Sequence, residues 1–239
     1  RVLFRSEAQK EAEDLARKHG FHKVSQLKLA VARKMKEFVT GGGFMFAMCS
    51  ATDSYDIALS AEGVDICERM YDGDPADPNA QAKLNYNNTF AFTDFKLVTD
   101  PLQYEFSDID NQPNERGLRQ DNDYFTLFEF SAKWDPIPTM LTQNHTRVIK
   151  GFFGQTTGFK NHLIKPDVLV MGENKQIRET KYIHGVMGKG FWTFYGGHDP
   201  EDYQHQVGEE PTDLNQHPNS PGYRLILNNV LFPAAKKKK

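Results

Sequence analysis

The amino-acid sequence predicts an α/β protein with an open, mostly parallel β-sheet flanked by helices. The main observation is an order of patterns near the start of the chain. A periodic helical segment ends at three glycines (41–43), an all-apolar run follows at 44–48, and a polar cluster comes directly after it. Helix, glycine turn and buried strand in succession are typical of α/β folds. A short strand that is apolar at every position indicates a sheet covered on both faces, as parallel sheets are.

Each further element is predicted from its own pattern. Residues 7–19 form a polar helical segment that Gly20 can end. Ser25 can cap a second helix, whose apolar residues recur at spacings of three and four. Later strands are expected at 124–130, 139–141, 168–171 and 191–195, and a last helix at 223–232. The aperiodic segments 72–88 and 107–123 are expected to be long loops.

Composition restricts the class of protein. Of the 239 residues, 38% are hydrophobic and 26% are charged, which is ordinary for a globular protein. The net charge of -3 gives no electrostatic reason to expect nucleic acid as a partner. No apolar stretch reaches the roughly 18 residues that a membrane span needs. We expect a small-molecule substrate, an amide or a sugar, and no cofactor, with a homo-oligomer as one option for its assembly.

The two ends of the chain are interpreted separately. The chain starts without Met, and residues 1–6 (RVLFRS) read as an in-frame translation of a common sequencing adapter, so we expect an artefact there. The natural protein would then extend upstream, with its first strands missing. Residues 7–235 are expected to form one domain, and residues 236–239 a basic tail.

Cys49 is the first candidate for a catalytic residue. It directly follows the expected strand at 44–48, and open α/β sheets place their sites at the carboxyl ends of strands. A thiolate at the start of the next helix would be stabilised by free N–H groups, which favours nucleophilic attack. Free cysteine is also among the most commonly buried residues, so a structural thiol is the alternative. Ser50, Thr52 and Asp53 are expected to line the site, with Ser50 and its neighbouring N–H groups binding an oxyanion.

His198 is the candidate for the base. It follows the strand expected at 191–195, and two glycines directly before it allow a backbone or a substrate to approach closely. A cysteine nucleophile requires a histidine that a carboxylate orients, and Glu201 is expected to supply it. By itself, a histidine in a polar turn is more often a cap or a surface residue. Four further residues of this segment are expected to contact a substrate: Gly196, Gly197, Asp199 and Tyr203.

Other polar residues carry weaker signals. His184, His205 and His217 lie near His198 in the sequence, but no pair has a tight metal-ligand spacing such as H-E-x-x-H, so no metal site is expected. The aspartates at 72–77 lack the glycine and the glutamate that define an EF-hand loop, and a solvated turn is expected instead. The two cysteines, Cys49 and Cys67, could form at most one disulfide.

Taken together, these segments resemble a known family. The glycine-rich turn and strand followed by Ser50-Ala51-Thr52-Asp53, the segment GKGFWTFYGGHDP at 188–200 and the segment YRLILNN at 223–229 resemble ThuA-like (trehalose-utilisation) proteins. These belong to the class I glutamine amidotransferase-like superfamily, with a flavodoxin-like sheet. The chain is also similar to a group of Bacteroidetes-type proteins that carry the name asparagine synthetase B.

The resemblance implies a function and a compartment. Class I amidotransferases use a Cys, His and Glu triad, which here would be Cys49, His198 and Glu201, although His-Asp-Pro-Glu is one residue longer than the family's His-Pro-Glu. The leading hypothesis is a thiol-dependent amide hydrolase or amidotransferase. The alternative is a carbohydrate-handling or non-catalytic module, in which aromatic residues stack on a sugar: Tyr55, Trp192, Tyr195 and Tyr203. Relatives often carry an export signal, which favours the bacterial cell envelope.

Overall fold

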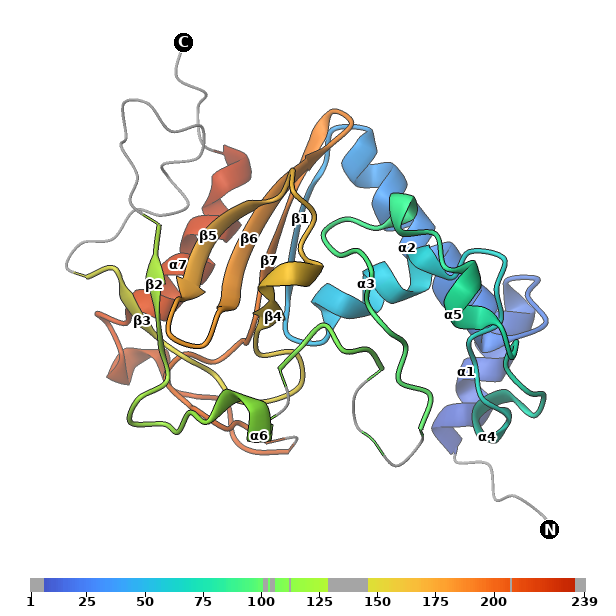
Figure 1. Cartoon of the computed structure of the whole chain (residues 1–239), viewed down its shortest axis with the longest axis horizontal. Helices are drawn as coiled ribbons and strands as arrows, with labels where there is room; N and C mark the ends of the chain where they lie inside the picture. Colours follow the sequence, from blue (N-terminus) through green and yellow to red (C-terminus); the bar gives the residue numbers. More distant parts are fainter. Residues whose placement is uncertain are drawn as a thin grey trace.

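A mixed β-sheet flanked by helices forms the centre of the chain (Figure 1), as seen in a computed structural model. The structure describes residues 7–100, 103, 106–111, 113–128, 146–206 and 208–234. Six strands lie side by side in the order β1-β7-β6-β5-β2-β3, and β4 pairs with β6. Their bounds are β1 Phe44–Met48, β2 Tyr124–Leu127, β3 Val148–Lys150, β4 Phe159–Lys160, β5 Leu169–Asn174, β6 Glu179–Met187 and β7 Gly190–Tyr195.

Three longer helices cover the sheet: α2 (Val24–Thr40), α3 (Ala51–Ser60) and α7 (Pro221–Leu231). The helix α1 (Glu7–Lys18) precedes them, and the predicted helices at both ends of the chain are therefore confirmed. Ser25 lies inside the first turn of α2 and does not cap it, whereas Ser220 caps α7 through the Tyr223 N–H. The expected loops contain short helical turns: α4 (Arg69–Asp72), α5 (Ala80–Lys83), η1 (Tyr86–Asn88) and α6 (Pro113–Arg116). Further 3-10 turns are η3 (Asn161–Leu163), η4 (Leu214–Gln216) and η5 (Phe232–Ala234).

The prediction of a mostly parallel sheet is wrong for the described residues. Only β1 and β7 pair in parallel there, and each of the other pairings is antiparallel. The sequence analysis missed β6, whose polar residues Glu179 and Lys181 disguise a strand that is almost wholly buried. A turn at Gly188 joins β6 to β7 as a hairpin, which makes this half of the sheet antiparallel. The strand expected at 139–141 lies outside the described residues.

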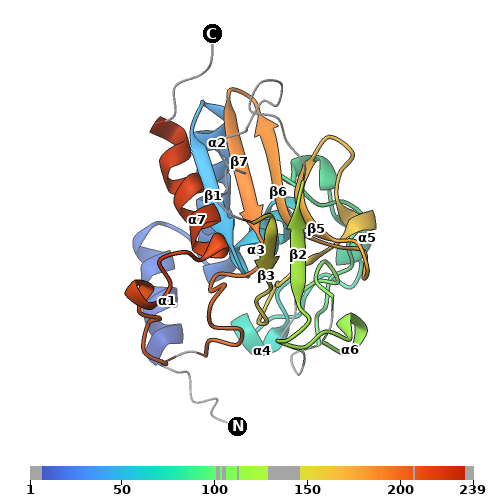
Figure 2. The ribbon, with the colours of Figure 1, turned by 90° about the vertical axis from the view of Figure 1, so that its left-hand side faces the viewer.

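Side chains on the two faces of the sheet pack into two separate cores. Alternate residues of β7 point to opposite faces, as the period of a strand requires. Trp192 and Phe194 join the core that α2 and α3 cover, while Tyr195 joins the core beneath α7. Figure 1 shows α7 on one side of the sheet with α2 and α3 on the other, and Figure 2 shows the same arrangement from the side. The predicted arrangement of helices on both faces is confirmed.

The β6–β7 hairpin packs against the end of α2 because its turn lacks side chains. Gly188 has a positive φ of 60°, and a Cβ there would lie 2.6 Å from the Thr40 carbonyl oxygen. A Cβ on Gly190 would lie 2.0 Å from the Val39 carbonyl oxygen. These glycines therefore serve close packing of backbone on backbone.

Two general features bear on the class of protein. Within the described ranges, every helix falls short of the length and apolar character that crossing a membrane would demand. Cys49 and Cys67 are both free thiols.

Candidate functional site

The carboxyl ends of β1 and β7 lie next to each other. The two strands are parallel neighbours with Met48 opposite Tyr195, and the Cys49 N–H donates to the Tyr195 carbonyl oxygen at 3.1 Å. Cys49 is the residue after β1, and His198 is three residues beyond the end of β7. Both predicted catalytic residues therefore leave the sheet at the same edge, where open α/β sheets carry their sites.

The backbone of Cys49 adopts a conformation that is unusual for a residue with a side chain. Its φ is +56°, in the left-handed region, which costs an L-residue roughly 1–2 kcal/mol. The turn is fixed by Thr52, whose N–H and hydroxyl both donate to the Cys49 carbonyl oxygen, at 3.1 and 2.8 Å. Cys49 thus occupies a strained turn between the strand β1 and the helix α3.

The Cys49 thiol is held in its protonated form. It donates a hydrogen bond to the Gln155 carbonyl oxygen at 2.9 Å. Burial raises the pKa of the thiol, the Ser50 N–H lowers it, and the carboxyl groups of Asp53 and Asp110 raise it further. The expected effect of the helix start is present through Ser50, but the effect of burial is larger.

The segment 151–158 packs over the ends of both strands. Gln155 accepts the bond from Cys49, and the ring of Phe152 lies 4.1 Å from the ring of His198. Two glycines make room for this segment: a Cβ on Gly196 would lie 2.5 Å from the Thr157 carbonyl oxygen, and one on Gly197 would lie 2.7 Å from Phe152. The sequence predicted that a backbone or a substrate approaches this glycine pair closely. In the structure, the protein's own segment 151–158 makes that approach.

The predicted carboxylates are engaged away from His198. Glu201 pairs with Lys150 at 2.7 Å and lies 3.5 Å from Nδ1 of His217. Asp199 accepts hydrogen bonds from the hydroxyls of Tyr223 and Thr212, at 2.5 and 2.8 Å. In the described part of the chain, Cys49, His198 and Glu201 are not joined by any hydrogen bond or ion pair.

The imidazole of His198 lies near two carboxyl groups, those of Asp199 and Asp202, and near the imidazole of His205. Burial lowers its pKa, Asp199 raises it, His205 lowers it and Asp202 raises it. The rings of His198 and His205 are 6.1 Å apart. At neutral pH, His198 is therefore mainly in the neutral form that a base requires.

The remaining predicted binding residues lie in two places. Thr52 and Asp53 are buried at the start of α3, where the Asp53 carboxylate accepts a hydrogen bond from the Thr156 hydroxyl at 3.1 Å. Ser50 is the residue before that helix. Tyr203 stacks on Phe153 with ring centroids 5.9 Å apart, and it lines a cavity of about 230 Å³ together with Lys150 and Glu201. Thr52 and Asp53 thus lie at the start of α3, whereas Tyr203 lies beside the cavity.

A buried network of charges lies beside the site, and the sequence analysis did not find it. We call it the charge network, and its members are Asp110, Arg116, Asp123, Glu179 and Lys181. Arg116 pairs with Asp123 at 2.8 Å and with Glu179 at 2.9 Å, and Lys181 pairs with Glu179 at 3.0 Å. Asp110 accepts the N–H groups of Thr157 and Gly158, both at 2.9 Å. The network thereby anchors the segment 151–158 that covers Cys49.

The carboxyl groups near Cys49 divide into two kinds. Burial raises the pKa of Asp53 to about 7 and that of Asp110 to about 6. Burial acts in the same direction on Glu179, but Lys181 and Arg116 outweigh it and bring its pKa to about 2. Asp53 can therefore exchange a proton near neutral pH, whereas Glu179 stays ionised.

Two aromatic residues predicted to stack on a sugar lie elsewhere. Trp192 and Tyr195 each have 1% of their surface exposed, one in each core of the sheet. Tyr55 packs against the first core. That part of the carbohydrate hypothesis is wrong, because a core ring cannot stack on a ligand, and Tyr203 alone remains beside a cavity.

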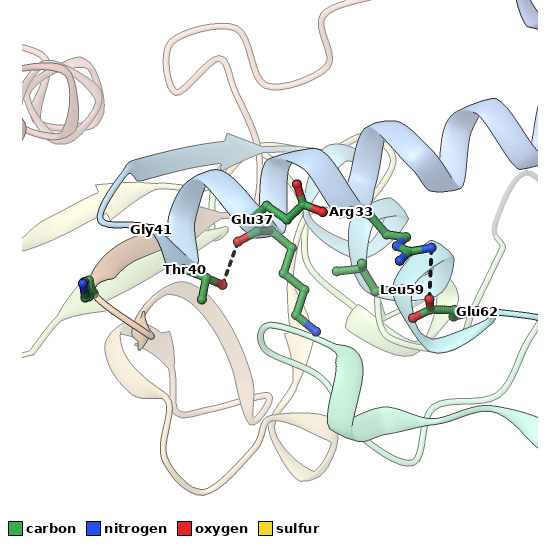
Figure 3. Close-up of a pocket in the computed structure, with 8 residues that line it drawn as sticks. Arg33, Glu37, Thr40, Gly41, Leu59 and Glu62 are labelled. Atoms are coloured by element: carbon green, nitrogen blue, oxygen red, sulfur yellow. Dashed lines mark hydrogen bonds and ion pairs between the residues drawn. The ribbon is translucent and has the colours of Figure 1, made fainter. Parts of the chain in front are cut away.

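A second cavity lies at the opposite end of the sheet. It has a volume of about 510 Å³, and Figure 3 shows it between α2, the end of α3 and the β6–β7 turn. Charged pairs line it, such as Arg33 with Glu62 at 3.2 Å. Because it faces the amino ends of β1 and β7, it is separate from Cys49 and His198.

Among the residues that the structure describes, two clusters of side chains have donor atoms close enough to hold a metal ion. In the first, the ammonium group of Lys23 bonds to Asp65 at 2.9 Å and to Asp74 at 2.5 Å, and lies 3.5 Å from Asp72. This ammonium group already occupies the space between the three carboxylates, so the acidic turn is held by protein contacts. The second cluster lies just beyond His198, and its members are Asp202, His205 and Glu209.

Comparison with family models, with curated proteins and with solved structures finds nothing that matches this chain.

Proposed function

We propose that the chain is a thiol-dependent amide hydrolase or amidotransferase-like enzyme, which releases ammonia from a small-molecule amide in the manner of class I glutamine amidotransferases. The observation that carries the proposal is the left-handed backbone of Cys49 at the turn between β1 and α3. Strained backbone persists only where the surrounding structure enforces it, and it concentrates at functional sites. A strained turn between a strand and a helix presents a nucleophile at the end of the sheet.

In the proposed reaction, the Cys49 sulfur attacks the carbonyl carbon of the amide. The thiol proton passes to His198 and then to the leaving nitrogen, so that the C–N bond breaks and ammonia leaves. Water then hydrolyses the thioester, which releases the carboxylic acid and restores the thiol. The Ser50 N–H, which interacts with the Cys49 sulfur, is the proposed donor to the oxyanion.

The covered state of the thiol has a consequence for this mechanism. The hydrogen bond from Cys49 to Gln155 must break before the sulfur can attack. The same segment contacts both residues, since Gln155 accepts from the thiol and Phe152 packs on the imidazole of His198. We therefore propose that substrate binding displaces the part of the segment around Phe152 and Gln155, ahead of the anchored Thr157 and Gly158, and brings the imidazole within reach of the thiol proton.

Ammonia release from glutamine, asparagine and simple amides tests the proposal. We expect Cys49→Ala to abolish release above the rate without enzyme. Cys67→Ala is the matched control, because Cys67 is also a partly buried free thiol with a raised pKa, and it should keep the full rate. Equal rates for the wild type and Cys49→Ala would refute the mechanism.

The alternative of a carbohydrate-binding module is supported by a single feature, the cavity of about 230 Å³ beside Tyr203, Lys150 and Glu201. A stacking ring next to charged groups is a common way to hold a sugar. Thermal unfolding in the presence of disaccharides tests it, since a bound ligand raises the apparent stability. A shift that Tyr203→Ala removes, together with no ammonia release, would favour this alternative.

A further inference from the structure

We infer that Asp202, His205 and Glu209 form a binding site for a divalent transition-metal ion such as Zn²⁺. The site goes beyond the proposed amide chemistry and does not depend on it. One ligand atom from each residue lies within 4.8 Å of the other two. The cluster combines one imidazole with two carboxylates, which are ligand types that zinc takes in proteins.

The distances suit a metal ion in place of a proton. Nδ1 of His205 is 3.0 Å from the Asp202 carboxylate and 3.9 Å from the Glu209 carboxylate. Ligands at about 2.0–2.1 Å from a tetrahedral zinc ion lie about 3.3–3.4 Å from one another, so the two observed distances bracket the value that coordination requires. Small rotations of the two carboxylates would complete the three-ligand geometry.

Charge and access also favour a cation here. Two carboxylates and a neutral imidazole balance the charge of a divalent ion. The side chains are 39%, 22% and 49% exposed for Asp202, His205 and Glu209, so an ion can enter from solvent. Glu209 is partly oriented already, because its carboxylate accepts the Gln206 N–H at 2.6 Å.

A second imidazole lies beside the cluster and supplies independent support. The ring of His198 is 6.1 Å from the ring of His205. Zinc sites take four ligands, and the fourth position here is available to water or to His198. The acidic cluster at Lys23 differs in this respect, because an ammonium group fills it.

Equilibrium dialysis against Zn²⁺ tests the site, with protein that carries no polyhistidine tag and has been treated with a chelator. We expect one Zn²⁺ per chain at the cluster. In His205→Ala the affinity should fall by about 100-fold or more, because loss of even an outer partner of a metal ligand costs 10–100-fold. Asp202→Asn and Glu209→Gln should weaken binding too, and they serve if His205→Ala does not fold.

The matched control is His217→Ala. His217 also places Nδ1 near a carboxylate, that of Glu201 at 3.5 Å, but it belongs to no group of three donors in the described residues. Its removal should leave the metal content unchanged. Binding that is equal in the wild type and in all three cluster variants would overturn the inference, as would a wild type that binds no Zn²⁺. Metal content is measured without reference to ammonia release, so the outcome is separate from that of the proposed enzyme activity.

Discussion

The polar groups beside the end of β1 differ from those after the end of β7. Beside β1, Cys49 and Asp53 adjoin the charge network, whose members are almost fully buried, with Arg116 and Lys181 paired to its carboxylates. After β7, His198 and the cluster of Asp202, His205 and Glu209 lie in partly exposed loops. Buried charges are costly to separate, whereas exposed ones contribute little to stability. The charge network and its anchors at Thr157 and Gly158 therefore hold a fixed geometry, whereas the backbone around Gln155 and the loops after β7 can rearrange around a ligand.

Among the changes that compare these two regions, the removal of Arg116 should lower the free energy of unfolding the most. Arg116 is 3% exposed and pairs with both Asp123 and Glu179, so Arg116→Ala leaves Asp123 buried without its cation and Glu179 with Lys181 alone. We expect a loss of about 3–5 kcal/mol in the free energy of unfolding. Arg119→Ala is the control, since Arg119 is 82% exposed in its pair with Asp121, and it should cost less than about 1 kcal/mol. Urea unfolding measures the loss of stability in both variants. Similar losses would contradict the difference between buried and exposed charges.

Asp53→Asn should change how stability depends on pH. Burial raises the pKa of Asp53 to about 7, above the unfolded value of about 3.9. The folded state then binds more protons than the unfolded state between about pH 4 and pH 7, so this carboxyl group makes the wild type less stable as the pH rises through that window. The neutral amide has no such loss. The measurement is urea unfolding at both ends of this pH window. As the pH rises, the free energy of unfolding of the variant should increase relative to that of the wild type.

Asp121→Asn provides the control for that pH profile, because Asp121 is 72% exposed. Its profile should run parallel to that of the wild type. A constant difference between Asp53→Asn and the wild type at every pH would show that Asp53 does not titrate in this window.

The smallest effect concerns the backbone of Cys49. Cys49→Gly and Cys49→Ala both remove the thiol and its bond to Gln155, but only glycine adopts a φ of +56° without strain. The glycine variant should therefore be about 1 kcal/mol more stable than the alanine variant in urea unfolding. Equal stability would show that the turn relaxes once the thiol is gone.

The sequence predicted the local elements better than the sheet. Gly20 marks the end of α1, and the helical spacing of apolar residues at 223–232 marks α7, through rules that depend on near neighbours. The antiparallel half of the sheet could not be predicted in this way, because β6 alternates buried charges with apolar residues. Glu179 and Lys181 read as a solvated strand face until Arg116 and Asp110 are known to cover them.

The candidate site was predicted in position and not in contacts. Cys49 and His198 do lie at one edge of the sheet, because β1 and β7 are parallel neighbours and each residue follows the carboxyl end of its strand. Their partners come from distant segments: Gln155 for the thiol, and Phe152 and His205 for the imidazole. The spacing D-x-x-H-x-x-x-E at 202–209 was visible in the sequence, but only a folded loop shows that the three side chains converge.

The bond between the Cys49 thiol and the Gln155 carbonyl oxygen links chemical reactivity to the opening of a loop. Because the thiol is partly buried and bonded to Gln155, we expect a maleimide reagent to react with it once the backbone around Gln155 moves away and the thiol ionises. The rate of labelling at Cys49 therefore reports the frequency of that opening. Any ligand that holds the segment down will protect the sulfur, so a screen by mass spectrometry can find compounds for this site before a substrate is known.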